Sequence, residues 1–210
     1  MTVGQSGRRA PTIARREEKR KPGSTIVKRS SPRSTHHERM QDDPSLAATI
    51  RSATRDDAPE IARLIRALAE YENLESELHA SEERLRAHLF GDRPLAEAIV
   101  AEAEGRIVGF AIYFSTYSTF RAQPGIWLED LFVEEGFRGR ALGRKLVERV
   151  IAIAKERGCG RVEWTALEWN TKALEFYRRT FGAQTLRETI VHRISLPAPA
   201  ERAARSDRDG

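Results

Sequence analysis

The chain has 210 residues, 40% of them hydrophobic, which is enough for one domain with a proper core. It holds no run of about 18 uncharged apolar residues and no apolar signal segment at the N-terminus, so we expect neither a membrane span nor secretion. Its single cysteine, Cys159, cannot form an internal disulfide, which suits a reducing compartment. Composition therefore predicts a cytoplasmic protein.

The net charge of +5 is distributed unevenly along the chain. Residues 1–46 carry 11 Lys+Arg and 5 Asp+Glu, whereas residues 47–196 carry 22 and 23. The first segment also lacks aromatic residues and apolar periodicity, so we predict a basic disordered tail over 1–46, one domain over 47–196 and a flexible tail over 197–210. Weak binding of nucleic acid through the first tail and a plain solvated extension both stay open as interpretations.

In the first half of the domain, strand and helix patterns alternate. Residues 48–54 read as a short strand, and a helix with one apolar stripe follows Asp57 and Pro59. A shorter helix is expected over 81–89, with Ser81 as its N-cap. Residues 97–117 then read as two strands of a hairpin.

The second half continues the alternation with strands over 126–133, 160–167 and 188–196 and helices over 142–157 and 171–180. Taken together, these elements predict a mixed α/β (α+β) fold in which one sheet is flanked by helices.

The stretch WLEDLFVEEGFRGRALGRKL, residues 127–146, combines a strand, a glycine-bearing turn and a helix start. Backbone N–H groups of the first helical turn have no partner within the helix and favour an anion. Gly139 and Gly143 permit a close approach of the backbone. The cationic side chains around them are Arg138, Arg140, Arg144 and Lys145. We predict a phosphate or pyrophosphate site, although an ordinary helix start would look the same.

The motif RGRALG, residues 138–143, resembles the pyrophosphate signature of the GNAT N-acetyltransferases, with Ala141 where many members have Gly. The blocks LIRALAEYENLE, IVGFAIYFSTY, WLEDLFVEEGFRG and LEWNTKALEFY are similar, in the same order, to the branch that contains the spermidine/spermine and thialysine acetyltransferases. The resemblance spans about residues 49–193 and implies the GNAT fold, in which a mostly antiparallel sheet splays open.

The resemblance also implies acetyl-CoA as cosubstrate and no metal. The positions it assigns to the cofactor are Leu131, Phe132, Val133, Arg138, Gly139, Arg140, Ala141, Leu142, Gly143, Arg144, Asn170, Lys172 and Tyr177. Backbone groups of 131–133 would pair with the pantetheine arm, and an N–H among them would face the thioester oxygen.

For catalysis, the resemblance makes Tyr177 the general acid for the leaving thiol and Glu129 the base or the anchor of the amine. Tyr71, Glu72 and Asp130 join Glu129 as acceptor-binding positions. Because neighbouring side chains of a strand point to opposite faces, we expect one carboxylate of the Glu129–Asp130 pair to face the cleft and the other to point away.

The acceptor is expected to be a cation, because residues 70–83 hold six glutamates and no Lys or Arg. We therefore predict transfer of acetyl from acetyl-CoA directly to the primary amine of a small diamine or polyamine. The resemblance to the branch also implies a homodimer. The alternatives are a thialysine-like or lysine-like amino acid, a protein lysine or another small amine. A CoA-binding module without activity and a module tethered to nucleic acid are the non-enzyme alternatives. The sequence departs from the pattern of the resembled family at two places that bear on the acceptor. Four residues separate Tyr177 from Gly182, where the family commonly has three, and the expected closing strand lacks the Trp that polyamine members tend to carry.

Overall fold

The structure is a computed structural model, and it describes residues 48–196; the two predicted tails lie outside the described residues. In chain order its helices and strands are β1 (Thr49–Ser52), α1 (Ala58–Glu72), α2 (Glu82–Phe90), β2 (Glu97–Ala103), β3 (Arg106–Ser118), β4 (Gln123–Val133), α3 (Leu142–Glu156), β5 (Val162–Glu163) and α4 (Thr171–Phe181). Within 48–196, no helix has the length and apolar character needed to cross a membrane.

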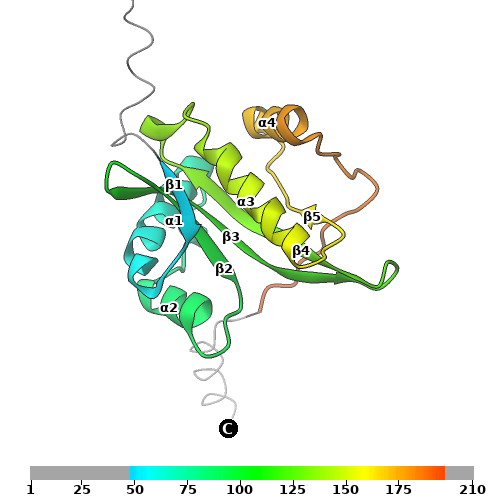
Figure 1. The fold of residues 1–210 in the computed structure, drawn as a ribbon, viewed down its shortest axis with the longest axis horizontal. Helices are drawn as coiled ribbons and strands as arrows, with labels where there is room; N and C mark the ends of the chain where they lie inside the picture. Colours follow the sequence, from blue (N-terminus) through cyan, green and yellow to red (C-terminus); the bar gives the residue numbers. More distant parts are fainter. Residues whose placement is uncertain (1–47, 197–210) are drawn as a thin grey trace, which may run out of the picture. The chain divides into compact units, whose positions relative to one another are not determined.

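The strands form one sheet in the order β1-β2-β3-β4-β5, and the first four are antiparallel (Figure 1). β5 runs parallel to β4 and pairs with it only at Ile126–Val162 and Trp127–Glu163. Beyond these two pairs, β4 continues to Val133 without β5 beside it. The expected mostly antiparallel sheet is thus confirmed, and its β4 and β5 strands separate after a short contact.

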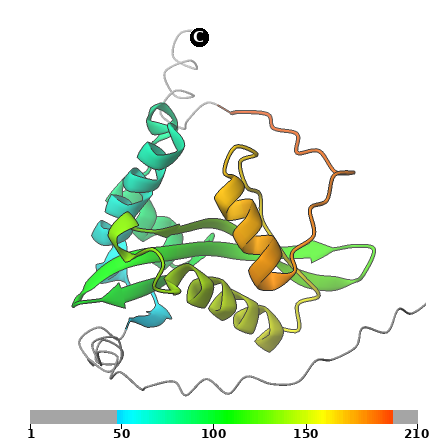
Figure 2. The ribbon, with the colours of Figure 1, turned by 90° about the horizontal axis from the view of Figure 1, so that it is seen from above.

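Helices cover both faces of the sheet (Figures 1 and 2). On one face, Ile61 and Leu64 of α1 are fully buried in a cluster with Phe110 of β3. On the other face, Leu146 and Val150 of α3 are fully buried in a second cluster. The predicted apolar stripes of these two helices therefore pack against the two faces of the sheet.

The end of α1 is fixed by Asn73, which adopts the left-handed conformation with φ 57 and donates its N–H back to the last turn. Asn tolerates this conformation better than most residues, so it ends a helix in the way glycine does. As a result, Tyr71 and Glu72 occupy the last turn of α1, close to the splayed edge of β4.

Two strand predictions differ from the structure. The strand expected over 160–167 is limited to Val162–Glu163, because the following residues leave β4. The closing strand expected over 188–196 is wrong: these residues form neither strand nor helix, and Ile190, Val191 and Ile194 are exposed. Alternating apolar residues form a strand only where a sheet edge pairs with them, and the described sheet ends at β5.

Candidate active site

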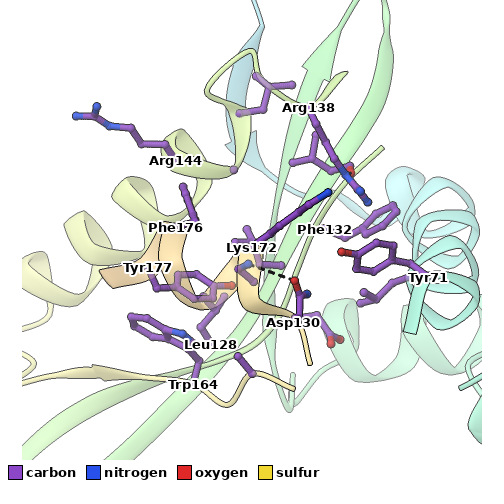
Figure 3. Close-up of a pocket in the computed structure, with 18 of the residues that line it drawn as sticks. Tyr71, Leu128, Asp130, Phe132, Arg138, Arg144, Trp164, Lys172, Phe176 and Tyr177 are labelled. Atoms are coloured by element: carbon purple, nitrogen blue, oxygen red, sulfur yellow. Dashed lines mark hydrogen bonds between the residues drawn. The ribbon is translucent and has the colours of Figure 1, made fainter. Parts of the chain in front are cut away.

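A cavity of about 660 Å³ opens where β4 and the chain after β5 separate. Its walls come from the end of α1, the second half of β4, the turn before α3, residues 164–167 and the first turns of α4 (Figure 3). The predicted site residues that line it are Tyr71, Glu72, Glu129, Asp130, Leu131, Phe132, Val133, Arg138, Gly139, Ala141, Leu142, Gly143, Arg144, Asn170, Lys172 and Tyr177. Segments more than 100 residues apart in the sequence therefore meet in one cavity.

A β-bulge in β4 brings both residues of the Glu129–Asp130 pair to this cavity. Ile112 of β3 pairs with Asp130 and Tyr113 pairs with Leu128, so Glu129 is an extra residue that has no partner in β3. The bulge interrupts the regular alternation of side chains. Both residues line the cavity, so the regular alternation on which we based our expectation of one inward and one outward carboxylate does not hold here.

The carboxylates of the cavity differ in their surroundings. Glu129 is exposed, and its carboxylate accepts a hydrogen bond of 2.8 Å from Trp127 Nε1. Burial, followed by the charges of Glu129 and Glu72, raises the pKa of Asp130 to about 6. Burial also raises the pKa of Glu72 above its ordinary value. Among the described residues, no group of three or more His, Cys, Asp or Glu is arranged to hold a metal ion.

Tyr177 approaches the cavity from α4, opposite Asp130 (Figure 3). Its ring packs against Trp164 and Phe176, with centroids 4.9 and 5.2 Å apart. Burial, with a smaller effect of the Glu72 charge, raises the pKa of Tyr177 to about 12. The hydroxyl therefore keeps its proton throughout the neutral range. Trp164 and Phe176 also line the cavity. Their sequence positions did not indicate this, because an aromatic residue in a strand or helix usually belongs to the core.

The turn before α3 has the backbone shape of an anion site. Gly139 has φ +80 and Ala141, the N-cap, has φ 60, both in the left-handed region. The first intrahelical bond is donated by Lys145 to Ala141 O, so the N–H groups of 142–144 have no partner within the helix. Gly143 presents open space, since an added Cβ would meet no atom within 4 Å. This donor set fits a pyrophosphate.

Two cationic residues line the cavity, Arg144 on α3 and Lys172 on α4. In Figure 3 the Arg144 side chain is directed away from the cavity, and its Nε pairs with Glu148 at 2.7 Å. Lys172 therefore carries the positive charge that a pyrophosphate or phosphate needs. Asn170 does not contribute its oxygen freely, because Oδ1 caps α4 by accepting a hydrogen bond of 3.2 Å from the Ala173 N–H.

Two arginines of the motif take positions that the sequence did not show. Arg138 Nε donates to the Val133 carbonyl at 2.9 Å, and the guanidinium lies 4.7 Å from the centre of the Tyr71 ring. Arg140 does not line the cavity; it pairs with Glu104 at 2.9 Å and lies over Phe137. The side chain of Arg138 thus joins the turn to the acceptor end of α1, whereas that of Arg140 holds the turn against the β2–β3 hairpin.

An aromatic pair joins the two sides of the cleft. Trp169, in the loop before α4, lies with its ring centroid 5.9 Å from that of Tyr71. The side chains are exposed by 54% and 37% respectively, but Trp169 does not line the cavity, and the Arg138 guanidinium already lies over the Tyr71 ring. The sequence did not indicate Trp169, because contact across the cleft depends on the course of the loop.

Comparisons with known proteins agree with this geometry. The sequence profile described as "Acetyltransferase (GNAT) family" matches residues 59–183. The thialysine N-epsilon-acetyltransferase of Bos taurus is 40% identical over 147 residues, which are 66% of this chain and 85% of that protein. The spermine/spermidine N(1)-acetyltransferase of Bacillus subtilis is 34% identical over 84 residues, 39% of this chain and 55% of that protein.

Solved structures show the same fold. A crystal structure of an aminoglycoside acetyltransferase from an uncultured soil metagenomic sample, in complex with sisomicin, aligns with a TM-score of 0.59 at 23% identity. The alignment covers 72% of this chain and 97% of that one. At this identity, the likeness concerns the fold alone. The profile match spans more than half of the 210 residues, and it coincides with the splayed sheet and the turn before α3. The chain therefore belongs to the GNAT acetyltransferase family.

Proposed function

We propose that this acetyltransferase transfers acetyl from acetyl-CoA directly to the primary amine of a small cationic acceptor of the diamine or polyamine class. The observation that carries the proposal is the composition of the cavity. One end offers free backbone N–H groups with Lys172, and the other end offers Glu72, Glu129 and Asp130. An anionic ligand part and a cationic one therefore fit at opposite ends of one cavity, which Tyr177 also lines.

The anionic end fits the pyrophosphate of acetyl-CoA. Backbone donors of 139–144 would hold the pyrophosphate, and the free edge of β4 at 131–133 would pair with the pantetheine arm. When bound, acetyl-CoA supplies an activated thioester. An N–H of β4 would donate to the thioester oxygen and stabilise the negative charge that develops there, an effect of about 3 kcal/mol in comparable sites.

The residues between the two ends then divide the work of the transfer. The carboxylates of Glu72 and Glu129 would hold the ammonium form of the acceptor by charge, and Glu129 stays oriented by its hydrogen bond to Trp127. Tyr177 would donate its proton to the leaving thiolate, since its hydroxyl is protonated at neutral pH. No residue of the chain needs to carry the acetyl group covalently.

The choice of acceptor class rests on charge. The cavity end at α1 combines the carboxylates of Glu72, Glu129 and Asp130, which suits an alkylammonium ion. The bovine relative is named for thialysine and the bacterial one for spermine and spermidine, and acceptors of both kinds are primary amines. A thialysine-like amino acid is therefore the second candidate, favoured by the higher identity of the bovine protein.

Thiol release from acetyl-CoA distinguishes these acceptors. We expect turnover with at least one member of a panel of putrescine, spermidine, spermine, thialysine, lysine and a lysine peptide, and the acceptor with the highest kcat/KM names the class. Added salt should raise KM more for an acceptor with a net charge of +2 or higher than for lysine, whose net charge is +1. Salt screens the attraction between the acceptor and the acidic end of the cavity. Acetyl-CoA binding without turnover of any amine would contradict the proposal and favour a CoA-binding module.

We also propose that the enzyme acts as a homodimer. Five large apolar side chains of 183–196 are at least 56% exposed, namely Leu186, Ile190, Val191, Ile194 and Leu196, and β5 forms the edge of the described sheet. A second copy could cover this segment by pairing it with a sheet edge. We expect sedimentation to give the mass of a dimer, and a chain shortened after residue 185 to give a monomer. An unchanged mass after shortening would contradict the assignment of this segment to the interface.

We propose a cytoplasmic location, supported by the free thiol of Cys159 and by the proposed use of acetyl-CoA. The N-terminal 46 residues are not required in the proposed reaction, so their deletion should leave thiol release unchanged. Loss of activity on this deletion would favour the view that the basic tail takes part in function.

A further inference from the structure

The bulge of β4 leaves two adjacent carboxylates in the cavity, and their surroundings suit different tasks. Glu129 is exposed and already accepts a hydrogen bond from Trp127 Nε1. Asp130 is partly buried, and within residues 48–196 no hydrogen bond or ion pair reaches its carboxylate from another side chain. A carboxylate without a donor or a cation partner is a better proton acceptor than one that has them.

The charged and titratable groups around Asp130 come from every wall of the cavity. They are Glu129 on β4, Glu72 on α1, Lys172 and Tyr177 on α4, and Arg138 and Arg144 on the turn and α3. Burial is the largest cause of the raised pKa of Asp130, and the charges of Glu129 and Glu72 add to it. Asp130 is therefore ionised at neutral pH, yet it binds a proton much more readily than an ordinary aspartate.

We propose that Asp130, rather than Glu129, accepts the proton that the bound ammonium group must lose before it attacks the thioester. This inference rests on the proposed acetyl transfer to a primary amine and deepens it. Glu129 and Glu72 then act as anchors whose negative charges hold the substrate and strengthen the neighbouring base. Figure 3 shows Asp130 and Tyr177 on opposite sides of the cavity, so the base and the acid approach the reacting atoms from different directions.

The proton balance of the step is complete with these two residues. The ammonium nitrogen gives one proton to the Asp130 carboxylate, and its lone pair forms the C–N bond as the C–S bond breaks. Tyr177 protonates the leaving thiolate. A second proton leaves the nitrogen as the amide forms and, passed on through solvent, restores the Tyr177 hydroxyl, while Asp130 later releases its proton to solvent.

The test compares Asp130→Asn with Glu129→Gln, two substitutions that remove a charge at almost constant volume. For the wild type, we expect kcat at saturating substrates to fall below a pH of about 6. Asp130→Asn should lower kcat at pH 7 by about 100-fold or more with a strongly basic alkylamine, whose pKa is about 10. Its rate should recover as pH rises, because the free amine becomes available without a base. Glu129→Gln should raise KM for the amine, and its kcat should still fall at acidic pH as in the wild type.

A second acceptor makes the test independent of general damage. With a fluorinated alkylamine, which is largely unprotonated at pH 7, the loss caused by Asp130→Asn should shrink to less than tenfold. Equal losses with both amines at all pH values would overturn the proposal, as would loss of the fall in kcat at acidic pH in Glu129→Gln instead. If the wild type turned over no amine of the panel from putrescine to the lysine peptide, the proposed function itself would fail, which is a different outcome.

The Asp130→Asn variant is expected to fold. The pKa of Asp130 is higher in the folded chain than its ordinary value of 3.8, so ionisation between that value and about 6 weakens the fold as pH rises. The neutral amide avoids this cost, and the unfolding temperature at pH 7 should not fall. Acetyl-CoA affinity measured by calorimetry should also stay within about twofold, since the carboxylate lies at the acceptor end and contacts no phosphate site.

Discussion

Replacing Tyr177 by Phe is expected to lower kcat about 100-fold, within the range for loss of a general acid. The phenylalanine ring keeps the packing against Trp164 and Phe176, so the change removes the hydroxyl and little else. Because the pKa of Tyr177 is raised to about 12, the wild-type rate should show no alkaline decline from this group below about pH 11. Thiol release measured from pH 6 to 10, together with acetyl-CoA affinity, checks both points.

A control and a rescue separate this role from a structural one. Tyr117→Phe removes a hydroxyl from a 62% exposed tyrosine on the β3–β4 hairpin, outside the cavity, and should leave the rate unchanged. An acetyl thioester of a more acidic thiol needs less help in leaving, so it should recover much of the rate lost in Tyr177→Phe. Full activity of Tyr177→Phe with acetyl-CoA would show that another group, or water, protonates the thiolate.

Helices and their ends were predictable because their signals are local. Asp57 and Pro59 mark the beginning of α1, and Ser81 caps α2 through the Arg84 N–H. Even the four residues between Tyr177 and Gly182 have a simple outcome: α4 continues to Phe181 and ends on left-handed Gly182 with φ 64. Each of these features depends on contacts within one or two turns of helix, which a sequence pattern reports directly.

Features that depend on two distant segments were not predictable in the same way. The bulge at Glu129 exists only in relation to Ile112 and Tyr113 of β3, and nothing in the sequence of β4 alone announces it. Likewise, the alternation in residues 188–196 is typical of a strand, but the pattern says nothing about whether a sheet edge is available. Site residues were predicted through resemblance, which does not report side-chain positions: Arg140 pairs with Glu104, and its side chain does not line the cavity.

Gly143→Asp is expected to weaken acetyl-CoA binding by about 100-fold while leaving the fold as stable as before or slightly more stable. Gly143 lies in the first turn of α3, and the added side chain has open space there. A carboxylate in a first turn interacts favourably with the helix dipole, by about 0.3–1 kcal/mol, and removal of glycine also favours the helix. The same carboxylate occupies the predicted pyrophosphate position, where two like unit charges about 4 Å apart repel by about 4 kcal/mol at an effective dielectric constant of 20.

The opposite signs of these two effects make the experiment decisive. Calorimetric titration with CoA measures the affinity, and thermal unfolding without ligand measures the stability. The neutral variant Gly143→Asn has nearly the same shape and should lose much less affinity, and salt should narrow the difference between the two variants because it screens the repulsion. An unchanged affinity in Gly143→Asp would place the pyrophosphate elsewhere. Equal losses of CoA affinity in both variants would show that the turn excludes any side chain. A loss of affinity confined to Gly143→Asp would show that the negative charge causes it, and would identify the N-terminus of α3 as the anion site.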